Sequence, residues 1–275
     1  QNTIDMKFKN RSQATKQTGL SYLGNTEINP KIIKSKKVSN TVTYSLMLSP
    51  ANTSGYNVCS HSTPECRLGC LHNSGRVKVE DYSGKNKIRK ARIKRTKLFF
   101  EEYEFFMNWL IAEIKAKKDK AHKEGFDFSI RLNTLSDIDW TKQYINDKTL
   151  FEIFSDVQFY DYTKNFRMFE MELPENYHLT LSYTGRNKAK CLKILQNGYN
   201  VAVIFDTPQF PEKWYGFPVI NGDLTDYRPL DNNGVVVGLQ FKYSANKEID
   251  KQVKNSCFVV NTINVPETNI TTIPV

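Results

Sequence analysis

The run Thr43-Tyr44-Ser45-Leu46-Met47-Leu48 has the apolar, aromatic and β-branched composition of a buried strand. Ser49-Pro50 follows directly and predicts the end of that strand. A loop then carries three cysteines, Cys59, Cys66 and Cys70, in the pattern Cys-x₆-Cys-x₃-Cys. The sequence therefore predicts three thiols at the carboxyl end of the first main strand.

Three thiols in one short loop are more typical of a metal site than of core packing or of thiols with no common role. A [4Fe-4S] cluster is satisfied by three cysteines when its fourth iron binds another ligand. Zinc would need a fourth ligand, which His61 or His72 could supply as Cys₃His coordination. We expect Cys59, Cys66 and Cys70 to ligate a metal centre, and the sequence leaves cluster and zinc as alternatives.

The rest of the chain alternates between helical and strand-like segments. A helical pattern covers residues 86–120, and helical segments such as 186–197 separate the later strands. The strand-like runs are residues 126–132, 157–162, 178–183, 201–205, 218–220 and 235–241. This alternation predicts an α/β fold with a parallel sheet, and no Gly-x-Gly-x-x-Gly follows the first strand. We expect a complete or partial (β/α) TIM-like barrel.

The 275 residues fit one large domain. We expect an irregular N-terminal arm or cap over residues 1–40, a barrel-like iron-sulfur domain over 41–260 and a C-terminal tail over 261–275.

Polar side chains follow the second and third strands of the expected barrel, where its active-site mouth would lie. Asn133 and Asp137 follow one strand, and Asp161, Tyr162 and Lys164 end the next. We expect Asp161, Tyr162, Lys164 and Asp137 to act on a substrate as carboxylates, phenol and ammonium. Asn133, with Arg76 beside the cysteine loop, is expected to help bind the cofactor. Helix caps and turns use the same residue types and are the competing explanation.

Arg131 and His178 lie inside strands. Each is expected either to point into the barrel, where it needs a partner, or to be a surface arginine and a hydrogen-bonded core histidine.

A net charge of +10 predicts attraction to anions. The densest basic segment is Lys87–Lys97, in the first turns of the long helix. Cations at a helix N-terminus oppose the helix dipole, so a nucleic acid or another anionic partner would explain them. The alternative is a solvated face, and no nucleic-acid-binding module is recognisable in the sequence.

No apolar run is long enough to span a bilayer, and residues 1–3 begin no signal-peptide pattern. Five cysteines make a disulfide framework unlikely on sequence grounds, and Cys191 and Cys257 sit in apolar surroundings typical of buried thiols. We expect a protein of the reducing cytoplasm with no membrane partner.

The order of strand, three-cysteine loop, helix and repeated β/α units resembles the layout of radical S-adenosylmethionine enzymes. The spacing differs from the Cys-x₃-Cys-x₂-Cys of that superfamily, and residues 131–137 stand where its Gly-Gly-Glu stretch would be.

The chain resembles more closely the gene-product-88-like family of bacteriophage proteins. The resemblance is carried by the cysteine loop with residues 73–76, and by residues 131–138, 159–164, 178–180, 200–203, 218–223 and 234–239. It implies a phage-encoded, cluster-binding protein of the infected bacterial cytoplasm and supplies no reaction.

We expect a [4Fe-4S] protein with one open iron, acting as a radical-S-adenosylmethionine-like or Lewis-acid enzyme on a small anionic molecule or on S-adenosylmethionine. One alternative is a non-enzymatic nucleic-acid or host-protein binder stapled by zinc or a cluster. Another is a redox-responsive sensor or inhibitor.

Overall fold

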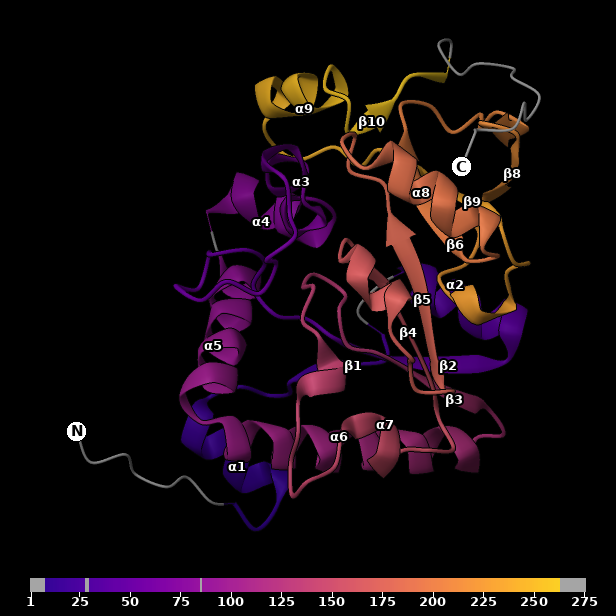
Figure 1. Cartoon of the computed structure of the whole chain (residues 1–275). Helices are drawn as coiled ribbons and strands as arrows, with labels where there is room; N and C mark the ends of the chain where they lie inside the picture. The colour runs from indigo at the N-terminus through magenta and orange to yellow at the C-terminus, as the bar shows by residue number, and fades with distance from the viewer. Residues whose placement is uncertain (1–7, 28–29, 85, 263–275) are drawn as a thin grey trace.

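The computed structural model describes residues 8–27, 30–84 and 86–262 of the chain and shows a mixed α/β fold (Figure 1). Ten strands of the described part form one sheet in the order β1-β2-β3-β4-β5-β6-β9-β8-β7, with β10 paired to β6. Their bounds are Gly24–Asn25 (β1), Thr41–Leu46 (β2), Asp127–Arg131 (β3), Gln158–Thr163 (β4), Tyr177–Ser182 (β5), Asn200–Phe205 (β6), Lys213–Trp214 (β7), Phe217–Asn221 (β8), Val236–Gln240 (β9) and Val259–Val260 (β10).

The parallel core of the sheet agrees with the expectation from sequence. Strands β2, β3, β4, β5, β6, β9 and β8 pair parallel to their neighbours, whereas β1 and β7 add antiparallel edges. Parallel strands must be joined by crossovers, which explains the long helical connections between them.

The outer face of the sheet is apolar and is covered by α6 (Tyr103–Lys123), α7 (Leu150–Ile153) and α8 (Lys188–Gln196) (Figure 1). Side chains alternate between the two faces of a strand, so Tyr44, Ile130 and Phe159 share this face and enter one core cluster with α6 and α7. A second cluster joins α8 to β6 around Cys191 and Val203.

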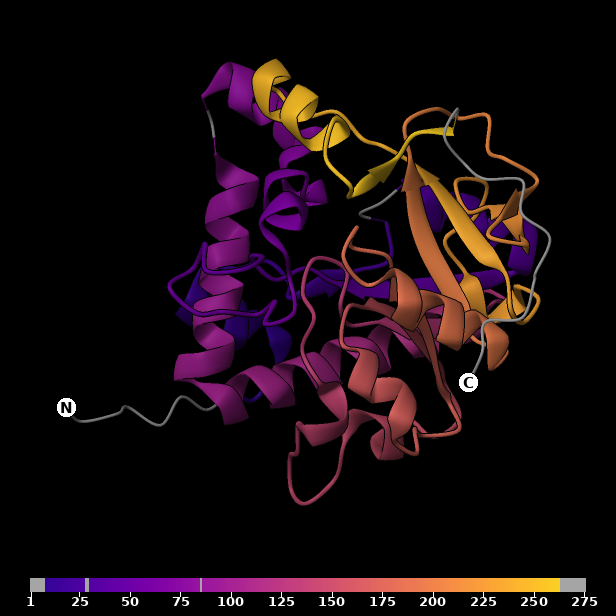
Figure 2. The ribbon, with the colours of Figure 1, turned by 45° about the horizontal axis from the view of Figure 1, so that its top comes forward.

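The long helical pattern is two helices. α5 (Lys87–Glu101) ends at Glu102, whose backbone has φ −137° and ψ 57°, and α6 begins at Tyr103. The break lets α6 run across the outer face of the sheet while α5 projects away from it (Figure 2).

The irregular arm expected over residues 1–40 is wrong where the structure describes it. α1 (Arg11–Thr18) begins at Asn10, whose side chain accepts a hydrogen bond from the Gln13 N–H, and it contacts α6. α2 (Pro30–Ser39) packs against β2. Tertiary packing stabilises these helices, since their sequences have little amphipathic periodicity of their own. Most of the tail expected over 261–275, residues 263–275, lies outside the described residues.

The sheet does not close, so a complete TIM barrel is not confirmed. Strands advance in chain order from β2 to β6, but β9 then lies between β6 and β8, so the chain reverses direction across the sheet. Crossovers are right-handed, and a reversal therefore moves the connection to the opposite face. The β8 to β9 connection, residues 222–235, follows this rule, and we call its first part, residues 222–231, the strap.

The strap crosses the inner face of the sheet. Asp226 accepts hydrogen bonds from Arg131 Nη1 of β3 at 2.7 and 2.9 Å and from the Tyr160 hydroxyl of β4 at 3.1 Å. On the other side, the Asp226 N–H donates to Ser35 Oγ of α2 at 2.7 Å, and Lys31 pairs with Asp223 at 2.5 Å. Together α2 and the strap connect β2, near one end of the sheet, to β8, near the other.

The inner face is polar, in contrast to the outer one. Thr43 and Ser129 share a hydrogen bond of 2.8 Å there, beside Arg131 and Tyr160. Buried groups of this kind need partners, and the strap supplies some of them. The inner face and the carboxyl edge of the strands are therefore the polar regions in which a ligand site can form.

Candidate metal centre at the carboxyl edge of the sheet

The cysteine loop is held by short capped helices. Thr63 caps α3 (Pro64–Leu68) by accepting a hydrogen bond from the Cys66 N–H at 3.2 Å, and Pro64 is the first helical residue. Cys70 begins the 3₁₀ turn η1 (Leu71–Asn73), and its Sγ accepts a hydrogen bond from the His72 N–H at 3.5 Å. These caps hold Cys66 within α3 and Cys70 at the start of η1.

Cys59 is tied to the loop that follows β3. The Ala51 N–H donates to Cys59 Sγ at 3.4 Å, and Cys59 Sγ donates to the Leu135 carbonyl at 3.6 Å. The Asp137 N–H donates to the Val58 carbonyl at 2.8 Å. The loops after β2 and β3 are thus joined beside the first cysteine.

The three thiols lie close enough to influence one another. Burial raises the pKa of Cys59, and the charges of Asp137 and Cys66 raise it further. Burial likewise raises the pKa of Cys70 to about 11, with added effects of Cys66 and Cys59. Their raised pKa values favour the neutral thiols of Cys59 and Cys70, so a nearby positive charge would be needed to stabilise their thiolates.

Lys164 supplies a positive charge at this point. It follows β4 and is half-buried, and burial alone would lower its pKa. The charges of Cys66, Asp137, Cys59 and Cys70 outweigh that effect and raise the pKa of the Lys164 ammonium. Among the described residues, no carboxylate forms an ion pair with it.

Asp137 holds the backbone of Lys164 in place at the end of β4. Its two carboxylate oxygens accept hydrogen bonds from the Thr163 hydroxyl at 2.7 Å and from the Lys164 N–H at 2.9 Å. Both oxygens are thereby engaged by the backbone and side chain of the β4 end. Asp137 therefore links the loops after β3 and β4.

The far side of the cysteine loop docks on the C-terminal part of the chain. Cys66 and Leu68 pack against a cluster formed by Phe241, Val253 and Phe258, and α9 (Lys247–Lys254) lies beside α3 (Figure 1). The Arg186 guanidinium, after β5, pairs with Glu65 of α3 at 2.5 Å. Loops from four strands and the C-terminal helix meet around the three thiols.

Neither histidine proposed for zinc is poised as a fourth ligand. His72 is buried, and its Nδ1 lies 3.0 Å from Arg92 Nη1. His61 is exposed, and its Nδ1 shares a hydrogen bond with the Ser60 hydroxyl. Within the described residues, no three His, Cys, Asp or Glu side chains are gathered closely enough to hold a single metal ion.

The structure separates the residues expected to act on a substrate. Tyr162 lies on the inner face and Lys164 follows the end of β4, whereas Asp161 points to the outer face and is fully buried. Asp161 accepts hydrogen bonds from the Asn133 N–H at 2.7 Å and the Tyr177 hydroxyl at 3.3 Å. Alternation along β4 thus directs Asp161 to the face opposite Tyr162, where both of its carboxylate oxygens accept hydrogen bonds.

Neither residue expected to bind the cofactor, Asn133 or Arg76, has the surroundings that its sequence position suggests. The Asn133 side chain holds the loop after β3: its amide donates to the Ile138 carbonyl, and its oxygen accepts from the Ser136 hydroxyl, the Ile138 N–H and Trp140 Nε1. Arg76 is exposed at the start of α4 (Arg76–Ser83). Asn133 has its polar atoms occupied, so we do not propose it as a cofactor ligand.

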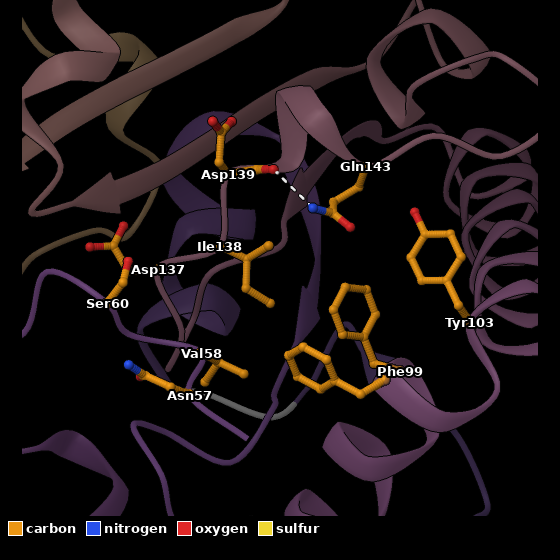
Figure 3. A pocket seen from close by; sticks show the side chains of 10 residues that line it. Asn57, Val58, Ser60, Phe99, Tyr103, Asp137, Ile138, Asp139 and Gln143 are labelled. Atoms are coloured by element: carbon orange, nitrogen blue, oxygen red, sulfur yellow. Dashed lines mark hydrogen bonds between the residues drawn. The ribbon is translucent and has the colours of Figure 1, made fainter. Parts of the chain in front are cut away.

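A pocket of about 310 Å³ lies beside the cysteine loop (Figure 3). Phe99 and Tyr103 line one side, and Asp137 and Asp139 line the other (Figure 3). Ser60, next to Cys59, also contributes. The pocket is large enough for a small molecule and is lined by Val58 and Ser60, the two neighbours of Cys59 in the sequence.

The basic side chains of the segment Lys87–Lys97 fall into a buried group and an exposed group on α5. Arg92 and Arg95 are buried, and Arg95 Nε donates to the Tyr22 carbonyl at 3.0 Å. The four lysines at positions 87, 90, 94 and 97 are exposed and share one face of α5 by their spacing. The two buried arginines are structural, and the lysines form a basic stripe.

The two remaining cysteines differ. Cys191 is buried in the core with α8, as expected, whereas Cys257 is exposed and lies beside Gly185. All five cysteines are free.

Among the described residues, no helix has the length and apolar character needed to cross a membrane. No curated protein and no solved structure matches the chain, so neither comparison supports the resemblance to radical S-adenosylmethionine enzymes. A family described as Gene product 88 matches residues 7–258. Because that match covers most of the sequence, the chain belongs to the Gene product 88 family.

Proposed function

We propose that the protein binds a [4Fe-4S] cluster through Cys59, Cys66 and Cys70 and uses the remaining iron to bind a small anionic molecule. The observation that carries this proposal is the position of Lys164, an ammonium group among three thiols with no carboxylate paired to it in the described chain. Three thiolates on a cluster carry net negative charge, and a half-buried cation beside them needs such a counter-charge.

The donor set suits a cluster better than a single ion. Thiolates that share one ion must converge on it, whereas the ligands of a cluster bind different irons and stay further apart. Cys59 and Cys66 lie near enough to Cys70 for their charges to raise its pKa. Among the described residues, however, no three His, Cys, Asp or Glu side chains are close enough together to hold a single metal ion. We therefore rank the cluster above Cys₃His zinc.

When bound, such a cluster supplies a Lewis-acidic iron or an electron. The chain's own residues hold and orient the ligand: Lys164 offers a cation beside the thiols, and Tyr162 lies two residues before it on the inner face. S-adenosylmethionine is a further candidate ligand, because its carboxylate would suit Lys164. A phage origin, which the sequence resemblance implies, would mean that this activity serves an infected bacterial cell.

Anaerobic reconstitution with iron and sulfide tests the proposal. We expect a brown protein with about four irons per chain and a paramagnetic signal after reduction. The variant with Cys59, Cys66 and Cys70 all changed to Ser should stay colourless, whereas Cys257→Ser, which removes another exposed thiol at the same edge, should bind iron normally. A colourless wild-type product, or iron retained by the triple variant, contradicts the proposal. Incubating the reduced protein with S-adenosylmethionine then tests that ligand by its cleavage.

A second candidate function is binding of nucleic acid on the stripe formed by Lys87, Lys90, Lys94 and Lys97. None of the four forms an ion pair within the described part of the chain. If they contact phosphates, the logarithm of the binding constant falls with the logarithm of salt at a slope of about −3 to −4. Changing all four to Gln should abolish that slope, whereas Lys120→Gln with Lys123→Gln on α6 should leave it unchanged.

A further inference from the structure

Several polar atoms on the inner face of the sheet are buried without a hydrogen-bond partner in the described structure. Five are donor atoms, namely His178 Nε2 and Thr180 Oγ1 of β5, Asn200 Nδ2 of β6, Arg131 Nε of β3 and Arg228 Nε of the strap. Ser45 Oγ of β2, Arg228 Nη1 and the strap carboxylate oxygens Asp223 Oδ1 and Asp231 Oδ2 also lack a hydrogen bond. The register of the sheet makes them neighbours, because Tyr160 pairs with His178, and Thr180 pairs with both Tyr162 and Asn200. Five unpartnered atoms thus gather on one face under one segment.

Arg228 is the central member of this group. It belongs to η4 (Arg228–Leu230), is 1% exposed, and contacts between η4 and β5 bring it over the inner face. Its Nη2 donates to the Thr225 carbonyl at 2.6 Å, and its Nη1 lies 3.1 Å from Asp231 Oδ2 without the alignment of a hydrogen bond. The guanidinium is therefore ion-paired with Asp231, while its Nε and Nη1 make no hydrogen bond in the described structure.

Unpartnered buried groups are costly. A buried donor or acceptor without a partner loses its hydrogen bonds to water and gains none in the protein, and native proteins contain few such groups. A cluster of them on one polar face is typical of a space that a polar ligand or ordered water completes.

The group is rich in donors. The guanidinium N–H groups, the Asn200 amide and the Thr180 hydroxyl all donate, and His178 Nε2 donates in one of its tautomers. The charge of Arg228 lowers the pKa of His178 after the larger effect of burial, so the two groups face each other closely. Donors converging beside a guanidinium match the oxygens of a carboxylate or a phosphate.

We infer that the inner face under the strap binds a small molecule through its carboxylate or phosphate group, with Arg228 as the anchor and His178, Thr180 and Tyr162 around it. This inference rests on the proposed function and names the substrate class of the same site. Lys164 lies two residues beyond Tyr162, just past the end of β4 and about 7 Å further along the chain. A ligand anchored at Arg228 can therefore reach the thiols with its other end.

The inference is tested by titrating inorganic phosphate and, separately, succinate into the protein and following the imidazole signals by NMR. The chain has four histidines, and His178→Gln assigns the relevant signal. We expect one of the two anions to shift the His178 signal saturably, with a Kd on the order of 1 mM. Tighter binding of phosphate would identify the natural ligand as a phosphate compound, and tighter binding of succinate would identify it as a carboxylate.

Arg228→Gln should weaken binding by about tenfold or more, whereas Arg167→Gln, an exposed arginine on η3 (Phe166–Glu170), should leave it unchanged. Thr180→Val keeps the shape and removes only an unpartnered hydroxyl. It should raise the melting temperature of the free protein and weaken anion binding several-fold. It also serves as the test if Arg228→Gln fails to fold.

Absence of a His178 shift with both anions, equal binding by Thr180→Val, or a shift that never saturates and so reports an adventitious ion only, would each overturn the inference. The measurement is made on protein with and without iron. Anion binding without iron uptake would leave this inference standing and reject the cluster. Iron uptake without anion binding would do the reverse.

Discussion

Lys164 is the residue on which the electrostatics of the candidate centre depend. A positive charge beside a cluster stabilises the reduced, more negative state. Lys164→Gln should therefore lower the reduction potential of the reconstituted protein by on the order of 50–100 mV, taking a separation of ~7 Å and an effective dielectric constant of ~20. Redox titration followed by electron paramagnetic resonance measures this.

Lys142→Gln is the matched control, because the Lys142 side chain is 64% exposed and its ammonium is paired with the Asp139 carboxylate. Equal potentials in Lys164→Gln and the wild type would show that the ammonium does not face the cluster.

Asp161 controls a pH dependence of stability. Burial raises the pKa of Asp161 to about 7, far above the 3.8 of an ordinary aspartate. Between these two values the folded protein holds a proton that the unfolded chain has lost, so stability falls as pH rises from about 4 to about 7. Asp161→Asn should remove this dependence, whereas Asp119→Asn on the exposed side of α6 should keep it.

Denaturant unfolding at about pH 5 and about pH 8 measures the effect. A wild type and an Asp161→Asn variant that lose equal stability between these two conditions would contradict the assignment.

Residue types alone predicted a site at the cysteine loop and Lys164, but they could not predict which face of the sheet the side chains next to Lys164 would point to. Asp161 and Tyr162 are adjacent in sequence, and strand alternation sends them to opposite faces. Arg228 gave no signal, since a single arginine before a proline in a connecting segment forms no recognisable motif. Its importance comes from long-range packing of the strap, which local sequence does not encode.

At the scale of elements, the contact between α3 and α9 holds the cysteine loop. Gly69 makes this contact close, since a Cβ at that position would lie 2.8 Å from Val253 Cγ1. Gly69→Ala should therefore push α9 away and cost about 1–3 kcal/mol of stability. Gly84→Ala has no such contact but has a positive φ, so Ser74→Ala on the exposed loop end is the better control.

Thermal unfolding compares the two variants. Equal melting temperatures for Gly69→Ala and the wild type would show that α9 does not pack closely on α3.

The strap depends on one buried ion pair. Arg131 and Asp226 have side chains 8% and 6% exposed and lie 2.7 Å apart. Asp226→Asn leaves a buried guanidinium without its counter-charge and should cost about 3–5 kcal/mol in the free energy of unfolding. Asp156→Asn removes the partner of Lys118 at a site 63% exposed and should cost less than about 1 kcal/mol. Similar losses in the two variants would mean that the strap is not anchored at Arg131.

Most of the strands were predictable from sequence, because β-branched and aromatic runs such as residues 201–205 and 235–241 are buried on at least one face. The helix α8 was equally clear from its spacing. The N-terminal helices were missed, because α1 and α2 are polar and owe their stability to contacts with α6 and β2.

For the whole molecule, the sequence predicted a parallel α/β fold and could not predict its strand order. The placement of β9 between β6 and β8 leaves the sheet open and carries the strap onto the inner face. In a closed barrel that face is usually filled by apolar side chains. Here it holds Arg131, Tyr160 and His178, so the topology itself produces a buried polar face beneath the strap.

The central claim is that three thiols around Lys164 hold an iron–sulfur cluster. The most direct test is elemental analysis of iron, sulfide and zinc in protein purified without oxygen, with the Cys59, Cys66 and Cys70 triple serine variant beside it. The account predicts about four irons and about four sulfides per wild-type chain and none in the variant. Zinc in place of iron, or no metal at all, would contradict it.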